Sequence, residues 1–177
     1  ERQTATAEVL RVIGSSMADA QPVFDSICAS ATRLLPGADL AIGSLGDDNL
    51  IHWRAGSGET RDAMRSVFPR PAPKTSGLLT GKATFLPDLL HGEGVPESLR
   101  AGARTLGRNV SMLSAAMTAG DRVLGTIAAF HTDMRAFTEE DGRLLKSFAD
   151  QATIAIQNAR LFRETQEALE RQTATAE

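Results

Sequence analysis

The chain lacks the residues that several common kinds of site require. Among its 177 residues it has one cysteine, no tyrosine, one tryptophan and three histidines. A single cysteine excludes an internal disulfide, a two-cysteine redox pair and a cysteine-rich zinc site. None of the histidines (His52, His91 and His131) has another histidine or a cysteine at a close metal-ligand spacing. The sequence therefore predicts no metal site.

A strong charge of one sign and a long hydrophobic run are also absent from the sequence. The 19 basic and 22 acidic residues give a net charge of −3. The basic residues are scattered among acidic ones, whereas nucleic acids and acidic membranes bind clustered positive charge. The longest uncharged stretch, residues 109–120, is too short to span a bilayer, and the first ten residues are not typical of a signal peptide. We therefore expect a cytoplasmic protein that neither binds nucleic acid nor inserts into a membrane.

The two ends of the chain carry the same eight-residue sequence. Residues 1–8 and residues 170–177 both read Glu-Arg-Gln-Thr-Ala-Thr-Ala-Glu. A repeat of this kind predicts a tandem array in which this chain is one unit of a longer protein. A local duplication of a helical linker would produce the same pattern. Under either interpretation, we expect helices to connect the chain to neighbouring modules.

The last quarter of the chain predicts one long helix over residues 139–177. Thr138 is a candidate N-cap that is followed by an acidic first turn, and only Gly142 interrupts the helical pattern as far as Gln172. Apolar residues at alternating three- and four-residue spacing predict a coiled-coil seam between two copies of the chain. The alternative is a long amphipathic core helix with a frayed end. We expect residues 139–160 to pack on the domain's own sheet. The seam residues are Leu145, Phe148, Ala152, Ala155, Ala159, Phe162 and Leu169.

Shorter elements are predicted between the two ends. A linker helix over residues 1–20 precedes a domain at 21–160, and residues 161–177 form the C-terminal linker. Strands in hairpins together with helices at both ends predict an α+β fold with a central antiparallel sheet of five or six strands. Within the domain we expect helices at 23–35, 60–67 and 96–106, strands at 38–45, 50–55, 83–86, 110–118 and 122–132, a proline-stiffened loop at 68–75 and a helical turn at 76–80.

Four segments of the sequence resemble a GAF domain. They are Leu78–Asp88, Arg122–Phe130, Phe137–Asp141 and Phe148–Leu161, and the resemblance covers about residues 20–165. Residues 168–177 resemble the helix between modules of multi-GAF sensor proteins of proteobacteria, which usually end in a histidine kinase or a nucleotide cyclase. The resemblance implies a GAF/PAS-like fold. The first and last helices would cover one face of the sheet, and a small-molecule pocket with short helices and loops would lie on the other face.

The resemblance also implies a function in signal transduction without catalysis by this domain. The expected activity is that of a sensory or relay module, a homodimer through its N- and C-terminal helices. It would pass ligand binding or an upstream conformational change to an adjacent GAF or output domain, such as the kinase of a two-component system. The alternative is a ligand-free spacer and dimerisation unit in a tandem array. A polar pocket would favour the sensor, and a pocket filled by Met64, Phe68, Met112 and Met117 would favour the spacer.

The candidate ligand-binding residues are polar or aromatic groups among apolar strands or near the expected pocket. Arg54 could meet an anion, and Ser76 could present the N-terminus of a short helix to one, although a solvated arginine and a simple helix cap explain the same residues. The complete set is Trp53, Arg54, Phe68, Ser76, Asp88, His91, Ser111 and Ser114.

The sequence disfavours each of the cofactors that GAF domains can carry. Photoreceptors of the family attach a bilin through a cysteine that is often next to a histidine, whereas Cys28 has no adjacent histidine and lies in the opening helix. The cyclic-nucleotide signature is only half present, since Phe137 and Asp141 keep its spacing but Gly142 replaces the final glutamate. Haem would require one of the three histidines, each of which is explained as a surface or core residue. We therefore expect no cofactor, although an unidentified small ligand would fit the family.

Overall fold

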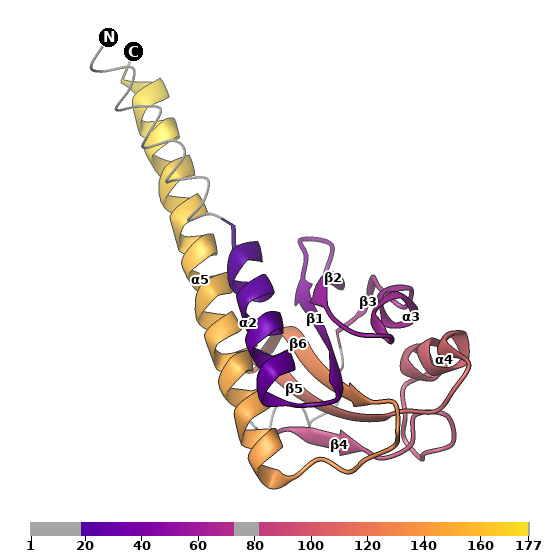
Figure 1. Ribbon diagram of the computed structural model, residues 1–177. Helices are drawn as coiled ribbons and strands as arrows, with labels where there is room; N and C mark the ends of the chain where they lie inside the picture. Colours follow the sequence, from indigo (N-terminus) through magenta and orange to yellow (C-terminus); the bar gives the residue numbers. More distant parts are fainter. Residues whose placement is uncertain (1–18, 73–81, 177) are drawn as a thin grey trace.

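Figure 1 shows the computed structural model, in which the sheet has the helices α2 and α5 on one side and α3 and α4 on the other. The structure describes residues 19–72 and 82–176. The helices are α2 (Gln21–Leu34), α3 (Arg61–Arg65), α4 (Glu97–Leu106) and α5 (Glu139–Thr175). The strands are β1 (Ala38–Leu45), β2 (Leu50–Gly56), β3 (Arg70–Pro71), β4 (Thr84–Leu86), β5 (Ser111–Ala119) and β6 (Arg122–His131).

The six strands form one antiparallel sheet in the order β3-β2-β1-β6-β5-β4. The two predicted hairpins, β1–β2 and β5–β6, are confirmed, as is the α+β class. The hairpins meet along β1 and β6, where the register runs from Ala38 opposite His131 to Ser44 opposite Gly125. This pairing places the first and the last strand of the domain side by side at the centre of the sheet.

The face of the sheet under α2 and α5, which we call the helical face, carries the larger part of the core. Alternate residues of each strand point to one face, so that Leu40 and Ile42 of β1 lie on this side together with Ile127 of β6. They contact Phe24, Ile27 and Ala31 of α2 and Leu145, Phe148 and Ala152 of α5, all of which are buried.

Helix α5 begins at the predicted position. The Thr138 side chain accepts a hydrogen bond from the Asp141 backbone N–H (3.1 Å), and the Asp141 carboxylate accepts one from the Thr138 backbone N–H (2.8 Å). This reciprocal arrangement is a capping box, which satisfies two backbone donors that the first helical turn leaves without partners. The helix then runs without interruption over 37 residues.

Four of the seven predicted seam residues lie inside the domain. Leu145, Phe148, Ala152 and Ala159 are buried, at most 6% exposed. These four side chains are therefore used by the domain's own packing and not left free for a second copy. Of the other three, Ala155 and Phe162 are half-buried and Leu169 is exposed.

The loop predicted at 68–75 differs from the structure in one respect. Arg70 and Pro71 pair with Ile51 and Leu50 as the short edge strand β3. A proline is compatible with an edge strand because its missing N–H can face away from the sheet. The predicted helical turn at 76–80, the terminal repeat at 1–8 and nearly all of the linker helix at 1–20 lie outside the described residues.

The capping box predicts a specific loss of stability. We expect Thr138→Ala to lower the free energy of unfolding by about 1 kcal/mol, because the Asp141 N–H loses its acceptor. For a chain of this length, that corresponds to a fall of about 2–4 °C in Tm, measured by circular dichroism. The control is Thr165→Ala in the exposed part of α5, where the Thr165 hydroxyl bonds only to the Leu161 carbonyl of its own helix. Equal Tm changes in the two variants would contradict the cap.

Candidate functional site

The face of the sheet under α3 and α4, which we call the distal face, is where the resemblance to the family predicts a pocket. In the described residues, apolar side chains fill the centre of this face. Met64 of α3 and Met112 of β5 are 1% and 3% exposed, whereas Met117 lies on the helical face. The buried residues packed together here are Ala41, Met64, Leu89, Val95, Leu99, Ala103, Val110, Met112, Ala128 and Phe130.

Two predicted site residues meet at the edge of this apolar cluster. Trp53 of β2 packs against the cluster, and its ring meets the Phe68 ring edge-on at a centroid separation of 5.6 Å. Both side chains are half-buried. Gly43 leaves room for the Phe68 ring, because a Cβ at residue 43 would lie 2.6 Å from Phe68 Cε1. Trp53 and Phe68 therefore form an aromatic pair beside the filled centre of the distal face.

Arg54 lies away from this pair, on the side of the sheet that faces α2 and α5. Its Nε donates to Ser44 Oγ (2.6 Å), and its carbonyl accepts from Gln21 Nε2 of α2 (2.6 Å). Phe24 and Ile156 line the same small cavity as Arg54. Arg54 therefore connects β1, β2 and α2 and is not brought together with Trp53.

Ser111 and Ser114 also lie on opposite faces of the sheet, since they are three residues apart in strand β5. The buried Ser111 hydroxyl donates to the Arg135 carbonyl (2.6 Å), which secures the segment between β6 and α5. Ser114 is 8% exposed and pairs with Ala128 and with Thr84. Only Ser114 is on the distal face.

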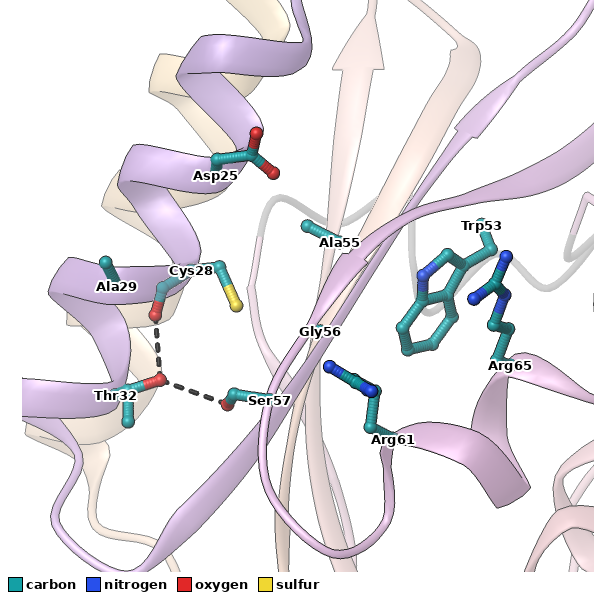
Figure 2. Close-up of a pocket in the computed structure, with 10 residues that line it drawn as sticks. All are labelled: Asp25, Cys28, Ala29, Thr32, Trp53, Ala55, Gly56, Ser57, Arg61 and Arg65. Atoms are coloured by element: carbon teal, nitrogen blue, oxygen red, sulfur yellow. Dashed lines mark hydrogen bonds between the residues drawn. The ribbon is translucent and has the colours of Figure 1, made fainter.

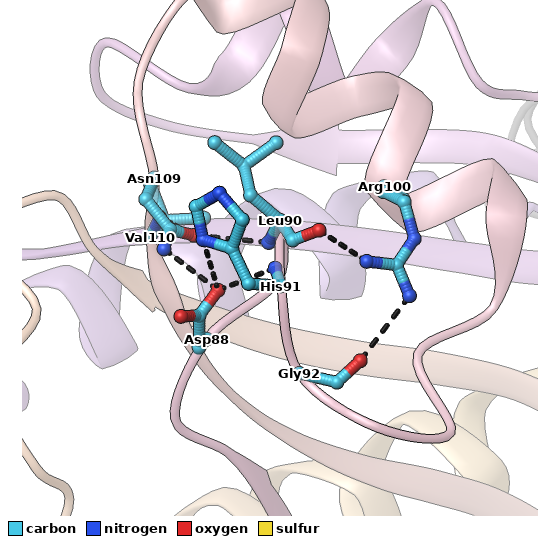
Figure 3. Close-up of polar contacts among 7 residues, drawn as sticks. All are labelled: Asp88, Leu90, His91, Gly92, Arg100, Asn109 and Val110. Carbon is cyan, nitrogen blue, oxygen red and sulfur yellow. Dashed lines mark hydrogen bonds and ion pairs between the residues drawn. The ribbon is translucent and has the colours of Figure 1, made fainter.

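Asp88 and His91 belong to a polar network that holds the loop between β4 and α4 (Figure 3). Asp88 Oδ1 accepts hydrogen bonds from the His91 backbone N–H and from Asn109 Nδ2, both at 2.7 Å. Arg100 of α4 donates to the carbonyls of Leu90 and Gly92. The His91 side chain is 75% exposed. These residues are therefore joined to the loop backbone and do not converge with Trp53 and Phe68.

Sequence reasoning missed Arg70, which is the most unusual polar group of the distal face. Its Nη2 donates to Thr126 Oγ1 of β6 (3.3 Å), and its guanidinium carbon lies 5.2 Å from the centre of the Phe68 ring. Its Nε is buried without a hydrogen-bond partner among the described residues, and loss of hydration lowers the pKa of the guanidinium. The only signal in the sequence was an arginine between two prolines.

A second cavity, the side cleft, has a volume of about 520 Å³ and lies between α2, the end of β2 and α3 (Figure 2). Trp53 forms part of its wall, but Arg61, Arg65 and Cys28 were not predicted to line any site. Cys28 is 7% exposed, and burial raises the pKa of its thiol. Because the protonated thiol is the less reactive form, this environment does not activate Cys28 as a nucleophile.

Three further expectations concern Ser76, a metal site and a membrane-spanning helix. Ser76 lies outside the described residues. Within residues 19–72 and 82–176, no three His, Cys, Asp or Glu side chains come together as a metal site would require. None of the helices in the same ranges combines the length and the hydrophobicity needed to cross a membrane.

Comparisons with known proteins match one family profile and several solved structures of the same fold. The profile of the family described as GAF domain matches residues 17–157. A comparison with curated protein sequences found no match. A GAF domain/HD domain protein from Geobacter sulfurreducens has a similar structure, with a TM-score of 0.68 and 18% identity over 84% of this chain and 98% of that one.

Two further solved structures show the same fold. A domain provisionally assigned to a two-component sensor histidine kinase of Sinorhizobium meliloti 1021 has a TM-score of 0.63 and 11% identity, over 80% of this chain and 92% of that one. The blue-light absorbing form of the PixJ GAF domain from Thermosynechococcus elongatus has a TM-score of 0.61 and 15% identity, over 86% and 94% of the two chains.

The loop network predicts a pH dependence that involves Asp88. Hydrogen bonds from the His91 N–H and from Asn109 lower the pKa of Asp88. Its contribution to stability is therefore present above the unfolded-state pKa of about 3.9 and is lost as the pH falls through the lower folded-state pKa. We expect Asp88→Asn to be less stable than wild type at pH 7, with a smaller difference at acidic pH, in denaturant titrations. The control Asp121→Asn changes an exposed turn residue, and equal behaviour of the two variants would contradict this role.

The guanidinium of Arg70, whose Nε is buried, predicts an increase in stability on substitution. We expect Arg70→Met to raise the free energy of unfolding by on the order of 1 kcal/mol, because a half-buried charge with no counter-ion in the described part of the chain is replaced by an apolar side chain of similar length. Chemical denaturation would measure this change, with Arg122→Met at an exposed position as the control. A variant less stable than the control would show that the contacts with Thr126 and Phe68 outweigh the cost of burial.

Proposed function

The chain belongs to the GAF domain family, and on this premise we propose that it is a sensory or relay module of a cytoplasmic signalling protein. The module itself is not an enzyme in this proposal. It passes a change in its own packing to an adjacent GAF domain, histidine kinase or cyclase. The structural similarity to a GAF domain/HD domain protein and to a sensor histidine kinase domain supports a role of this general kind.

The observation that supports the proposal is that helix α5 has a first part packed on the domain and a second part that is exposed. Up to Ala159, one side of the helix is buried against the sheet and α2, whereas from Arg160 to Thr175 all side chains are exposed except that of Phe162, which is half-buried. At 1.5 Å per residue, this second part is about 22 Å long. In Figure 1 it extends beyond the sheet. A shift in the packing under the first part therefore moves the second part as one piece.

Dimerisation is the second part of the proposal. Because the domain core already uses four predicted seam residues, the dimer contacts belong to the exposed part of α5. Ile154, Leu161 and Leu169 are each more than half exposed. Together with Phe162 they lie within one side of the helix, since residues seven apart differ by only about 20° in direction. This apolar stripe fits a parallel copy of the same helix.

The ligand, in this proposal, is a small molecule that is not covalently attached. PixJ is an example of a similar domain that absorbs light, and the resemblance to the family places the attachment of a bilin at a cysteine. The only cysteine of this chain, Cys28, lies on α2 at the side cleft, not on the distal face. A covalent bilin on the distal face is therefore not proposed.

The spacer alternative has a specific observation in its favour. Met64 and Met112 fill the centre of the distal face, as expected of a module that has no ligand there. Arg70 favours the sensor, because an apolar spacer has no need of a guanidinium whose Nε is buried without a hydrogen-bond partner among the described residues.

Native mass spectrometry of the chain as purified from cells tests the proposal. We expect a dimer that carries an added mass of a few hundred daltons. A dimer without added mass would support the spacer.

The variant Phe162→Glu places a charge in the apolar stripe, and we expect it to be monomeric, whereas Arg163→Glu on the neighbouring exposed position should remain dimeric. A dimeric Phe162→Glu would contradict the contact through this part of α5.

A further inference from the structure

The side cleft combines residues from three elements at one edge of the sheet. Strand β3 pairs only with Leu50 and Ile51, so the rest of β2 has no neighbouring strand on that side among residues 19–72 and 82–176. The cleft lies beside this part of β2. Its lining consists of Asp25, Cys28, Ala29 and Thr32 from α2, Trp53, Ala55, Gly56 and Ser57 from β2 and the residue after it, and Arg61 and Arg65 from α3.

Positive charge is concentrated at the α3 end of the cleft. Arg61 and Arg65 are four residues apart on the same short helix, a spacing at which like charges repel. Among the described residues, Arg61 has only the carboxylate of its chain neighbour, Asp62, at 3.5 Å, and Arg65 has no ion pair. At the other end, Asp25 accepts a hydrogen bond from Gln21 (3.0 Å). An acidic group in the cleft would therefore be directed to the α3 end.

An aromatic surface lies next to this charge. Figure 2 shows the Trp53 indole beside Arg65, with Arg61 projecting toward Gly56 and Ser57. Gly56 is required for this arrangement, because a Cβ at that position would collide with the Trp53 ring. The edge-on contact with Phe68 fixes the orientation of the indole. A planar ring entering the cleft can pack on Trp53 without displacing it.

The two hydroxyl groups of the cleft, those of Thr32 and Ser57, are already hydrogen-bonded. Thr32 Oγ1 donates to the Cys28 carbonyl (2.8 Å), so the Ser57 hydroxyl is the donor in the 3.0 Å contact between Ser57 and Thr32. Ser57 Oγ also accepts from the Leu40 backbone N–H (3.1 Å). The two arginines are thus the cationic groups of the cleft with donors left for a ligand, and guanidinium groups bind carboxylate and phosphate in two-point contacts.

We propose that the side cleft binds a small aromatic molecule that carries a carboxylate or phosphate group, with its ring on Trp53 and its acidic group at Arg61 and Arg65. The volume of about 520 Å³ is within the range of small-molecule sites. The inference rests on the proposed sensory function and assigns the ligand to this site instead of the distal face. Because α2 forms one wall of the cleft and packs on α5, the site is directly connected to the helix that leaves the domain.

The experiment uses two reporters that the chain supplies. Trp53 is the only tryptophan and Cys28 the only cysteine, and both line the cleft. We expect benzoate or phenyl phosphate, titrated to about 50 mM at constant ionic strength, to change the Trp53 fluorescence saturably. The same anions should slow the labelling of Cys28 by a thiol reagent. Benzamide, which has the ring without the charge, and acetate, which has the charge without the ring, should each bind at least about tenfold more weakly.

Variants assign the response to the arginines. Arg61→Gln and Arg65→Gln should each weaken binding of the aromatic anion about tenfold or more, because each loses a charged two-point contact. Arg122→Gln makes the same change of charge at an exposed position at the start of β6 and should leave binding unchanged. Both arginines of α3 are at the surface, so the variants should keep the circular dichroism spectrum and Tm of the wild type.

Three outcomes would overturn the assignment of the ligand to the side cleft. The proposal is wrong if neither anion gives a saturable change, if benzamide binds as well as benzoate, or if the α3 variants bind like Arg122→Gln. A preference between benzoate and phenyl phosphate identifies the acidic group. Native mass spectrometry distinguishes a wrong assignment of the ligand site from a failure of the proposed sensory function. An added mass retained in Arg65→Gln would place the ligand elsewhere in a working sensor, and a wild-type chain without added mass would count against the sensor itself.

Discussion

The packing of α5 on the helical face is the constraint on which the rest of this structure depends. Leu145, Phe148 and Ala152 must be covered, and the elements that cover them are β5 and β6 of one hairpin together with α2, which also packs on β1 and β2 of the other hairpin. The capping box at Thr138 sets where the helix begins. The same packing decides which side chains of α5 remain exposed. In α5, only the apolar stripe and the exposed end are therefore free to contact a second copy.

The elements of this fold could be predicted from the sequence because their signals are local. Turn residues mark both hairpins, and Thr138 with its acidic turn marks the start of α5. The predicted seam identified the apolar side of α5 but not its partner, since a core helix and a coiled coil share the same periodicity in this range. The resemblance to the family resolved the fold as a whole, but it could not tell whether the pocket of this particular member is filled.

The site was harder to predict because it depends on which face of the sheet each residue occupies. Trp53 and Arg54 are adjacent, as candidate ligand residues often are, yet they point to different sides of β2. Arg70 reaches Thr126 across 56 residues of sequence, a contact that only the tertiary structure creates. The side cleft likewise requires α2, β2 and α3 to meet. Its two arginines resemble ordinary surface residues in the sequence, and their position beside Trp53 follows from the strand register and from Gly56.

We propose an account of the molecule in which a domain with a largely filled distal face transmits changes at its edge through α2 and α5. Its central claim is that α5 behaves as one element on both sides of residue 160. Hydrogen exchange of the α5 amides in wild type and in Leu145→Ala, followed by mass spectrometry, tests this most directly. The account predicts that loosening the buried part of the helix speeds exchange both before and after residue 160. Faster exchange confined to residues 139–159 would show that the two parts are independent and would contradict the account.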